Sequence, residues 1–98
     1  MICVKVYRHG PEVLVAASDE DILGKTFKSG ELRLQVSKSF YKGESGDEDL
    51  LVNRLEMATI ANLAGNKTLE IAIRRGFVDK DCVIVIGGVP HAQMARMM

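Results

Sequence analysis

The segment IGGVPHAQM, residues 86–94, brings together residue types that bind ligands in many proteins. Two consecutive glycines follow an apolar run, and consecutive glycine amides can form a concave site for an anion. A histidine and a glutamine come next and offer an acid–base group and an amide. The segment therefore predicts a ligand-binding corner formed by Gly87, Gly88, His91 and Gln93. The structural alternative is that the glycines and Pro90, cis or trans, only turn the chain out of a sheet.

Five cations follow one another in the first half of the chain, and they predict a second candidate site. Strand alternation could place several of them on one face, where they would contact successive phosphates of a nucleic acid. Tyr7 and Tyr41 lie near Arg8 and Lys42, and aromatic rings beside cations can stack on bases. The candidate RNA-binding residues are therefore Lys25, Lys28, Arg33, Lys38, Tyr41 and Lys42. Two structural interpretations compete with this one: a solvated sheet edge that resists aggregation, and tyrosines that close the core edge.

The chain lacks the short motifs of the common enzyme classes. His9 and His91 do not have metalloprotease spacing, and no GxSxG, GxGxxG or Walker sequence occurs. His91 as acid–base with Cys82 as nucleophile and Asp79 or Asp81 as orienting group would have suitable chemistry, but no spacing supports the set. The sequence favours a protein without catalytic residues, metal ligands or a cofactor, and it leaves enzymatic activity open.

Length and composition limit the choice of protein class. The 98 residues suit a single α+β domain over residues 1–98. Lys plus Arg and Asp plus Glu number 13 each, so any nucleic-acid binding must depend on a local patch rather than on bulk attraction. The apolar run at 82–86 is too short to span a membrane, and the N-terminus lacks the apolar core of a secretory signal. Cys3 and Cys82 are distant and outside any CxxC, which predicts unbridged core thiols in a cytoplasmic protein.

The period of the apolar residues predicts the elements that would carry the two candidate sites. Over residues 2–37 they alternate with a period of two around the turns HGPE and KSG, which indicates an antiparallel sheet of about four strands. The run CVIVI at 82–86 has no polar alternation and is typical of a buried, interior strand. The ligand-binding corner would follow directly after this strand.

Near Ser45 the apolar period becomes helical. Ser45 and Glu48 match a capping box, and Gly65 has the position of a left-handed residue at a helix C-terminus. Asn66 would cap a second helix, so an αα-hairpin over residues 46–75 is predicted to cover the sheet. The Met-rich end, AQMARMM, predicts a short helix that docks on the core or on a second subunit.

Three segments resemble a known family: VLVAASDEDILGKTFKSGELRLQVSKSFYKG, ATIANLAGNKTLEIAIRRGFVD and VIVIGGVPHAQ. The family is the domain-of-unknown-function family 424, and the resemblance covers nearly the whole chain except the final MARMM. It implies an archaeal cytoplasmic protein, at most one predicted to bind RNA. It supplies no catalytic residue for this sequence.

Three functional interpretations follow. The first is a noncatalytic RNA-binding or translation-associated module, whose partner would be RNA or a translation-related complex. The second is a small-ligand or enzymatic site at the GGVPH corner. The third is a homo-oligomeric interaction protein, such as a homodimer formed through the helices or the Met-rich tail. The surface positions of the cations, of His91 and of exposed apolar side chains distinguish the three.

Overall fold

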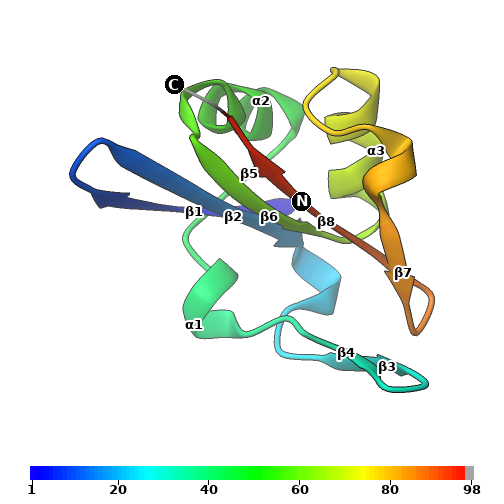
Figure 1. Cartoon of the computed structure of the whole chain (residues 1–98). Coiled ribbons are helices and arrows are strands. Elements are labelled where there is room, and N and C mark those ends of the chain that lie inside the picture. The colour runs from blue at the N-terminus through cyan, green and yellow to red at the C-terminus, as the bar shows by residue number, and fades with distance from the viewer. Residues whose placement is uncertain (97–98) are drawn as a thin grey trace.

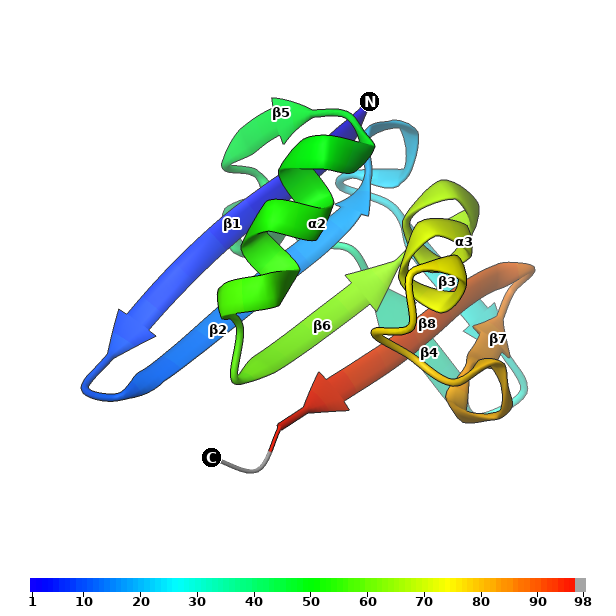
Figure 2. The same cartoon turned by 90° about the horizontal axis from the view of Figure 1, so that it is seen from above.

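A mixed six-stranded sheet forms the centre of the protein, for which a computed structural model describes residues 1–96 (Figure 1). Its strands lie in the order β5-β1-β2-β6-β8-β7, which can be followed from above in Figure 2. The β2–β6 pair is parallel, with Ala17 opposite Leu63, and the other pairs are antiparallel. The strand bounds are β1 Ile2–His9, β2 Glu12–Asp19, β5 Glu44–Gly46, β6 Ile60–Ala64, β7 Ile84–Ile86 and β8 Val89–Ala95.

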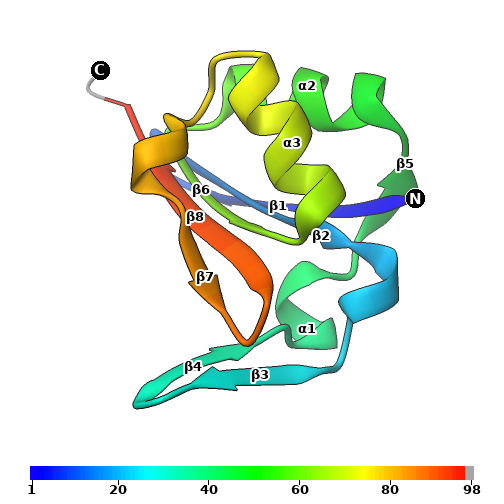
Figure 3. The same cartoon turned by 90° about the vertical axis from the view of Figure 1, so that its right-hand side faces the viewer.

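The two faces of the sheet are covered by different elements (Figure 3). Helices α2 (Glu48–Met57) and α3 (Asn66–Arg74) lie on one face. The short helix α1 (Lys38–Tyr41) and a separate two-stranded hairpin, β3 (Thr26–Ser29) with β4 (Leu32–Gln35), lie against the other face, which we call the underside. Two 3-10 turns, Glu20–Ile22 and Lys80–Cys82, complete the described elements. None of the helices in residues 1–96 is long and apolar enough to cross a membrane.

Strand alternation divides the core between the two faces, because successive side chains point to opposite sides of a strand. On β1 and β2, Val4 and Val15 face the helices and pack with Leu51, Leu55 and Leu69. On the underside, a second cluster joins the sheet to α1 and the hairpin: Ala16, Leu34, Val36, Tyr41, Ala64, Ile86 and Val89. The hairpin is therefore held to the sheet by burial of its Leu34 side.

The predicted αα-hairpin is wrong, because strand β6 lies between the two helices. Helix α2 ends at Met57 with Ala58 as its C-cap, and the β-branched Thr59 then continues the chain with its backbone N–H bonded to the Val13 carbonyl. Strand β6 is apolar except for Asn62, and such a run matches a helical pattern as well as a strand. Gly65 consequently precedes α3 as its N-cap, with φ +107°, instead of ending α2.

The capping residue of α2 is also different from the prediction. Asp47 occupies the N-cap and accepts a hydrogen bond from the Asp49 amide at 3.1 Å. Ser45 belongs to β5, where it is the register partner of Cys3, and its hydroxyl donates to Glu20. Pairing of this short strand with β1 displaces the helix start by two residues.

The predicted four-stranded antiparallel sheet is correct only for β1 and β2, since β3 and β4 form their own sheet. The predicted interior strand at 82–86 is wrong as well. Strand β7 is the last strand of the sheet, and Ile84 and Val85 are 52% and 58% exposed. The chain turns back after Ile86, so that β8 takes the interior position. The helix expected in the Met-rich end is a strand as far as Ala95, while residues 97 and 98 lie outside the described residues.

The cysteines are both free thiols, as predicted, but their surroundings differ. Cys3 is buried on β1, where burial raises the pKa of its thiol. Cys82 is exposed beside the edge strand, so the expectation of a second core thiol is wrong.

The two-residue turn Gly87–Gly88 joins β7 to β8 and rests on the β3–β4 hairpin. Its φ values of +56° and +83° suit the primed turns of tight hairpins, and Pro90 is trans. The Gly87 amide donates to the Ser29 hydroxyl at 3.0 Å. A Cβ atom at Gly87 would lie 2.9 Å from the Lys28 backbone nitrogen, whereas one at Gly88 would meet nothing within 4 Å. Gly87 therefore permits close contact between the two hairpins.

Replacement of Gly87 by alanine should destabilise the protein more than the same change at Gly88. Both changes strain a left-handed residue, which costs about 1 to 2 kcal/mol, but only Gly87→Ala also pushes the hairpins apart, for a total of about 2 to 4 kcal/mol. Urea unfolding of both variants measures the difference. Equal losses would show that the hairpins do not depend on this contact.

Candidate nucleic-acid interface

A groove of about 490 Å³ lies between the β3–β4 hairpin and the underside of the sheet. Arg33 and Gln35 line it from the hairpin, Phe40 from α1, and Asn62 and His91 from the sheet. The other lining residues are Leu34, Ser37 and Tyr41. Residues of both predicted sites therefore line the same groove: Arg33 and Tyr41 from the RNA-binding set, and His91 from the ligand-binding corner.

Asn62 and His91 form the floor of the groove, and with Gln93, which lines an adjoining hollow, they make a row of polar side chains on β6 and β8. Asn62 and Gln93 are register partners, and the Gln93 Nε2 donates to the Asn62 Oδ1 at 2.9 Å. His91 lies two residues before Gln93 and so shares its face of the sheet. It also lines a smaller adjoining hollow of about 190 Å³ with Cys82, Ile84, Ala92 and Gln93. The polar row thus continues from the groove toward the sheet edge.

His91 is held in its neutral form at pH 7 by its surroundings. Partial burial lowers its pKa from the ordinary value of 6.5, because the charged imidazolium loses hydration. A neutral imidazole presents one N–H donor and one nitrogen acceptor. Among the described hydrogen bonds, none joins His91 to Cys82, and no group of three His, Cys, Asp or Glu residues in residues 1–96 is arranged to hold a metal ion.

Helix α1 brings two aromatic residues to the groove, Phe40 and Tyr41, and the two side chains differ in exposure. Tyr41 is 4% exposed and belongs to the underside core, so its ring is not available for stacking on a base. Phe40 is half-buried and lines the groove. Its ring stacks on Tyr7, with centroids 5.4 Å apart, and the Tyr7 hydroxyl donates to the Phe40 carbonyl. Phe40 therefore takes the place of Tyr41 as the accessible aromatic residue.

The candidate cations are divided between two places. Lys28 and Arg33 are direct partners across the β3–β4 pair and so project from the same face of the hairpin. Lys25 precedes this hairpin and is exposed. Lys38 and Lys42 instead line a separate hollow with Cys3 and Glu20, beside β5. The structure joins Lys28 and Arg33 into one patch next to the groove and separates Lys38 and Lys42 from it.

In the Gly87–Gly88 turn, one of the two glycine amides of the predicted ligand-binding corner has a partner within the protein. The Gly87 amide donates to Ser29, so the glycines serve the contact between the hairpins. Gln93 and His91, which follow the turn on β8, are the parts of the predicted corner that reach the groove region.

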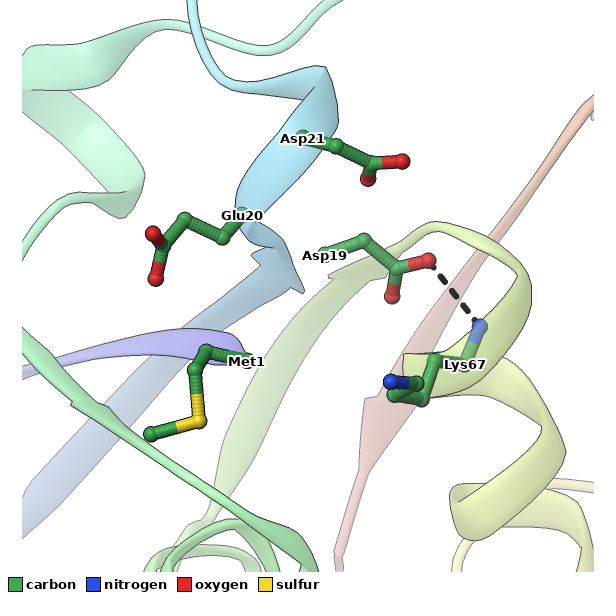
Figure 4. A pocket seen from close by; sticks show the side chains of 5 residues that line it. All are labelled: Met1, Asp19, Glu20, Asp21 and Lys67. Atoms are coloured by element: carbon green, nitrogen blue, oxygen red, sulfur yellow. Dashed lines mark hydrogen bonds between the residues drawn. The ribbon is translucent and has the colours of Figure 1, made fainter.

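A further hollow, of about 400 Å³, lies at the N-terminus of α3 and is lined by Met1, Asp19, Glu20, Asp21 and Lys67 (Figure 4). The parallel strands β2 and β6 end here, and α/β proteins often bind anions at such a place. In this protein Asp19 occupies it: its carboxylate accepts from the Lys67 and Thr68 amides at 3.0 and 2.8 Å and from the Thr68 hydroxyl. The chain's own carboxylate therefore satisfies the helix amides that would bind an anion.

These features define a small α+β protein with an open mixed sheet, two helices on one face and a docked hairpin on the other. The chain belongs to the family described as protein of unknown function (DUF424), whose model matches residues 7–97. This result confirms the resemblance seen in the sequence. A crystal structure of an uncharacterized conserved protein from Methanopyrus kandleri is similar, with 26% sequence identity and a TM-score of 0.79. The match covers 99% of this chain and 95% of that one. The comparison with curated proteins gave no match.

Sequence reasoning missed five residues of the groove: Leu34, Gln35, Ser37, Phe40 and Asn62. Phe40 lies between two lysines in KSFYK, which is the same pattern that drew attention to Tyr41. Asn62 is the single polar residue of the apolar strand IANLA. That signal could have been read only if the segment had been recognised as a strand, because alternation then places Asn62 on the face opposite Ala61 and Leu63.

Removal of the Asp19 carboxylate should destabilise the protein through α3. Asp19→Ala leaves the first amides of the helix without their acceptor, and we expect a loss of about 1 to 3 kcal/mol in the free energy of unfolding. Asp21→Ala is the matched control, since it removes the same charge from an exposed neighbour. A similar loss in both variants, measured by urea unfolding, would argue against the capping role.

Burial of His91 should make the protein less stable in mild acid. Because its folded-state pKa is lowered, the unfolded chain binds more protons between the folded-state value and 6.5, and the free energy of unfolding must fall as the pH falls through that window. His91→Gln should reduce this loss. Urea unfolding at about pH 7 and about pH 5.5 measures it, with replacement of the exposed His9 by Gln as the control. An unchanged pH dependence in His91→Gln would contradict the assignment.

Proposed function

We propose that this protein is a noncatalytic RNA-binding or translation-associated module, and that it binds single-stranded RNA along the groove beside the β3–β4 hairpin. The observation that carries the proposal is the cross-strand pair of Lys28 and Arg33. Like charges directly opposite each other destabilise a hairpin. Within residues 1–96 neither side chain forms an ion pair that would offset the repulsion. An RNA phosphate would neutralise the pair.

The arrangement of charge on the rest of the molecule supports the same conclusion. On the helix side of the sheet, Arg54 pairs with Glu44, and both Arg74 and Arg75 pair with Glu48. These cations are already neutralised by their neighbours. The net charge of zero therefore conceals a local positive patch at the hairpin, and a local patch is what phosphate contacts require.

The groove suits bases that are not held in a duplex. Its wall contains the ring of Phe40, and its lining contains the amides of Gln35 and Asn62 beside the guanidinium of Arg33. Single-stranded RNA exposes base faces and edges to such groups, whereas the deep, narrow major groove of an RNA duplex hides most edges from side chains. An RNA strand that places its bases in the groove and its phosphates on Lys28 and Arg33 would contact both the groove and the cation pair. Lys25 is exposed just before the hairpin, while Lys38 and Lys42 line a separate hollow.

Charge reversal on the hairpin should weaken RNA binding. The double variant Lys28→Glu, Arg33→Glu removes two phosphate contacts, so its affinity should fall and its salt dependence should become shallower by about 0.7 in the log–log slope per lost contact. Lys67→Glu, Lys80→Glu is the matched control, because it makes the same change in net charge at exposed lysines outside the hairpin, in α3 and in the Lys80–Cys82 turn. The measurement is a salt titration of binding to pooled cellular RNA.

Two results would contradict the proposal. The first is the absence of detectable binding by the parent protein at low salt. The second is an equal loss of affinity in the hairpin and control variants, which would indicate nonspecific attraction rather than a site.

A further inference from the structure

We infer that the floor of the groove reads one unpaired base through the amide pair of Asn62 and Gln93 together with His91. This inference rests on the RNA-binding function proposed above and goes beyond it, because it assigns selectivity for a base to side chains that carry no charge. It also assigns contact with phosphate and contact with a base to different elements, the β3–β4 hairpin and the β6–β8 pair.

The amide pair has the hydrogen-bonding groups that a base edge requires. One bond already joins Gln93 Nε2 to Asn62 Oδ1, which holds the two side chains in place. The pair still offers the Asn62 amino group as a donor and the Gln93 carbonyl as an acceptor. If the nitrogen and oxygen atoms of both side-chain amides exchange places, the pair still offers one donor and one acceptor. The edges of nucleobases present neighbouring donors and acceptors, and side-chain amides bind them in pairs of hydrogen bonds.

His91 adds a third uncharged polar group beside this pair. Because burial lowers its pKa, it does not carry the positive charge that would favour a phosphate over a base at pH 7. The one donor and one acceptor of the neutral imidazole suit the edge of a base, as the two amides do. Arg33, on the opposite wall of the groove, is the charged group that remains for the adjoining phosphate.

Apolar side chains border the polar row on both sides. The alternation of β6 places Ile60 on the same face as Asn62, and the register of β7 with β8 places Ile84 opposite His91. Ile60 and Ile84 are 41% and 52% exposed, so both leave apolar surface open beside the polar row. A flat base over the amide pair would cover apolar surface at its margins and satisfy hydrogen bonds at its edge. Phe40 supplies the neighbouring ring.

The test measures the contribution of the base to RNA affinity separately from that of the ribose-phosphate backbone. The probe is a fluorescently labelled abasic ribose-phosphate strand about nine units long, within the usual span of single-strand sites, that carries one central nucleoside or none. Adenosine, cytidine, guanosine and uridine are each placed at the centre. We expect that at least one base tightens binding of the parent protein by about tenfold over the fully abasic strand, as one good pair of base hydrogen bonds would.

Asn62→Ala and Gln93→Ala should each remove most of this gain and leave the affinity for the fully abasic strand unchanged. Gln93 is exposed, so its variant keeps the test valid if Asn62→Ala folds poorly. Asn66→Ala, at the exposed start of α3 on the other face, is the matched control and should keep the full gain. The hairpin double variant should lose affinity for every strand by the same factor.

The outcomes distinguish this inference from the function on which it rests. If no strand binds and cellular RNA does not bind either, the RNA-binding proposal fails. If the strands bind in a salt-dependent manner but no base improves the affinity, the base-reading inference is overturned and the phosphate-binding hairpin remains. A gain that persists in both Asn62→Ala and Gln93→Ala would also overturn it.

Discussion

The carboxylate of Asp19 is the contact on which the arrangement of the elements depends. It ends β2 and binds the first amides of α3, a helix that lies almost fifty residues later in the chain. Gly65 makes this approach possible, because a Cβ atom there would overlap the Asp19 carboxyl group and because its φ of +107° suits glycine. Once the end of β2 is joined to the start of α3, β6 must lie parallel beside β2. The connection between these two strands then has to cross the molecule, and it carries the hairpin and α1 to the underside.

That crossover creates the groove. A hairpin that belongs to neither edge of the main sheet can be held only by packing, and it packs through Leu34, Val36 and Phe27 against the underside. Its second support is the Gly87–Gly88 turn, whose amide binds Ser29. Between these two supports, the hairpin stands away from β6 and β8 and leaves Asn62 and His91 open to the groove. The glycines predicted to bind a ligand thus position the hairpin that forms the wall of the groove.

Charge has two different uses in this molecule. On the helix side, carboxylates and guanidinium groups neutralise each other at distances of 2.6 to 2.8 Å, and such exposed pairs contribute little to stability. At the hairpin, two cations oppose each other across a strand pair, and neither forms an ion pair among the described residues. A local cost in stability of this kind is common where a site awaits a ligand of opposite charge. The groove floor beside it is uncharged, so two cations and a row of uncharged hydrogen-bonding groups lie next to each other.

Features that depend on near neighbours in the chain could be predicted from the sequence. The β1–β2 hairpin, the KSG turn of β3–β4, the helical character of residues 48–57 and 66–74, and the unbridged cysteines all follow from local periodicity, turn residues or spacing. Long-range pairing decided the rest. Whether IANLA forms a helix or a strand depends on the Val13 carbonyl and on β8, which the local pattern does not contain. Burial of Tyr41 and exposure of Phe40 depend on how α1 meets the sheet. Arg33 and His91 belong to two hairpins that are more than fifty residues apart in the sequence. They line one groove because tertiary packing brings the two hairpins together.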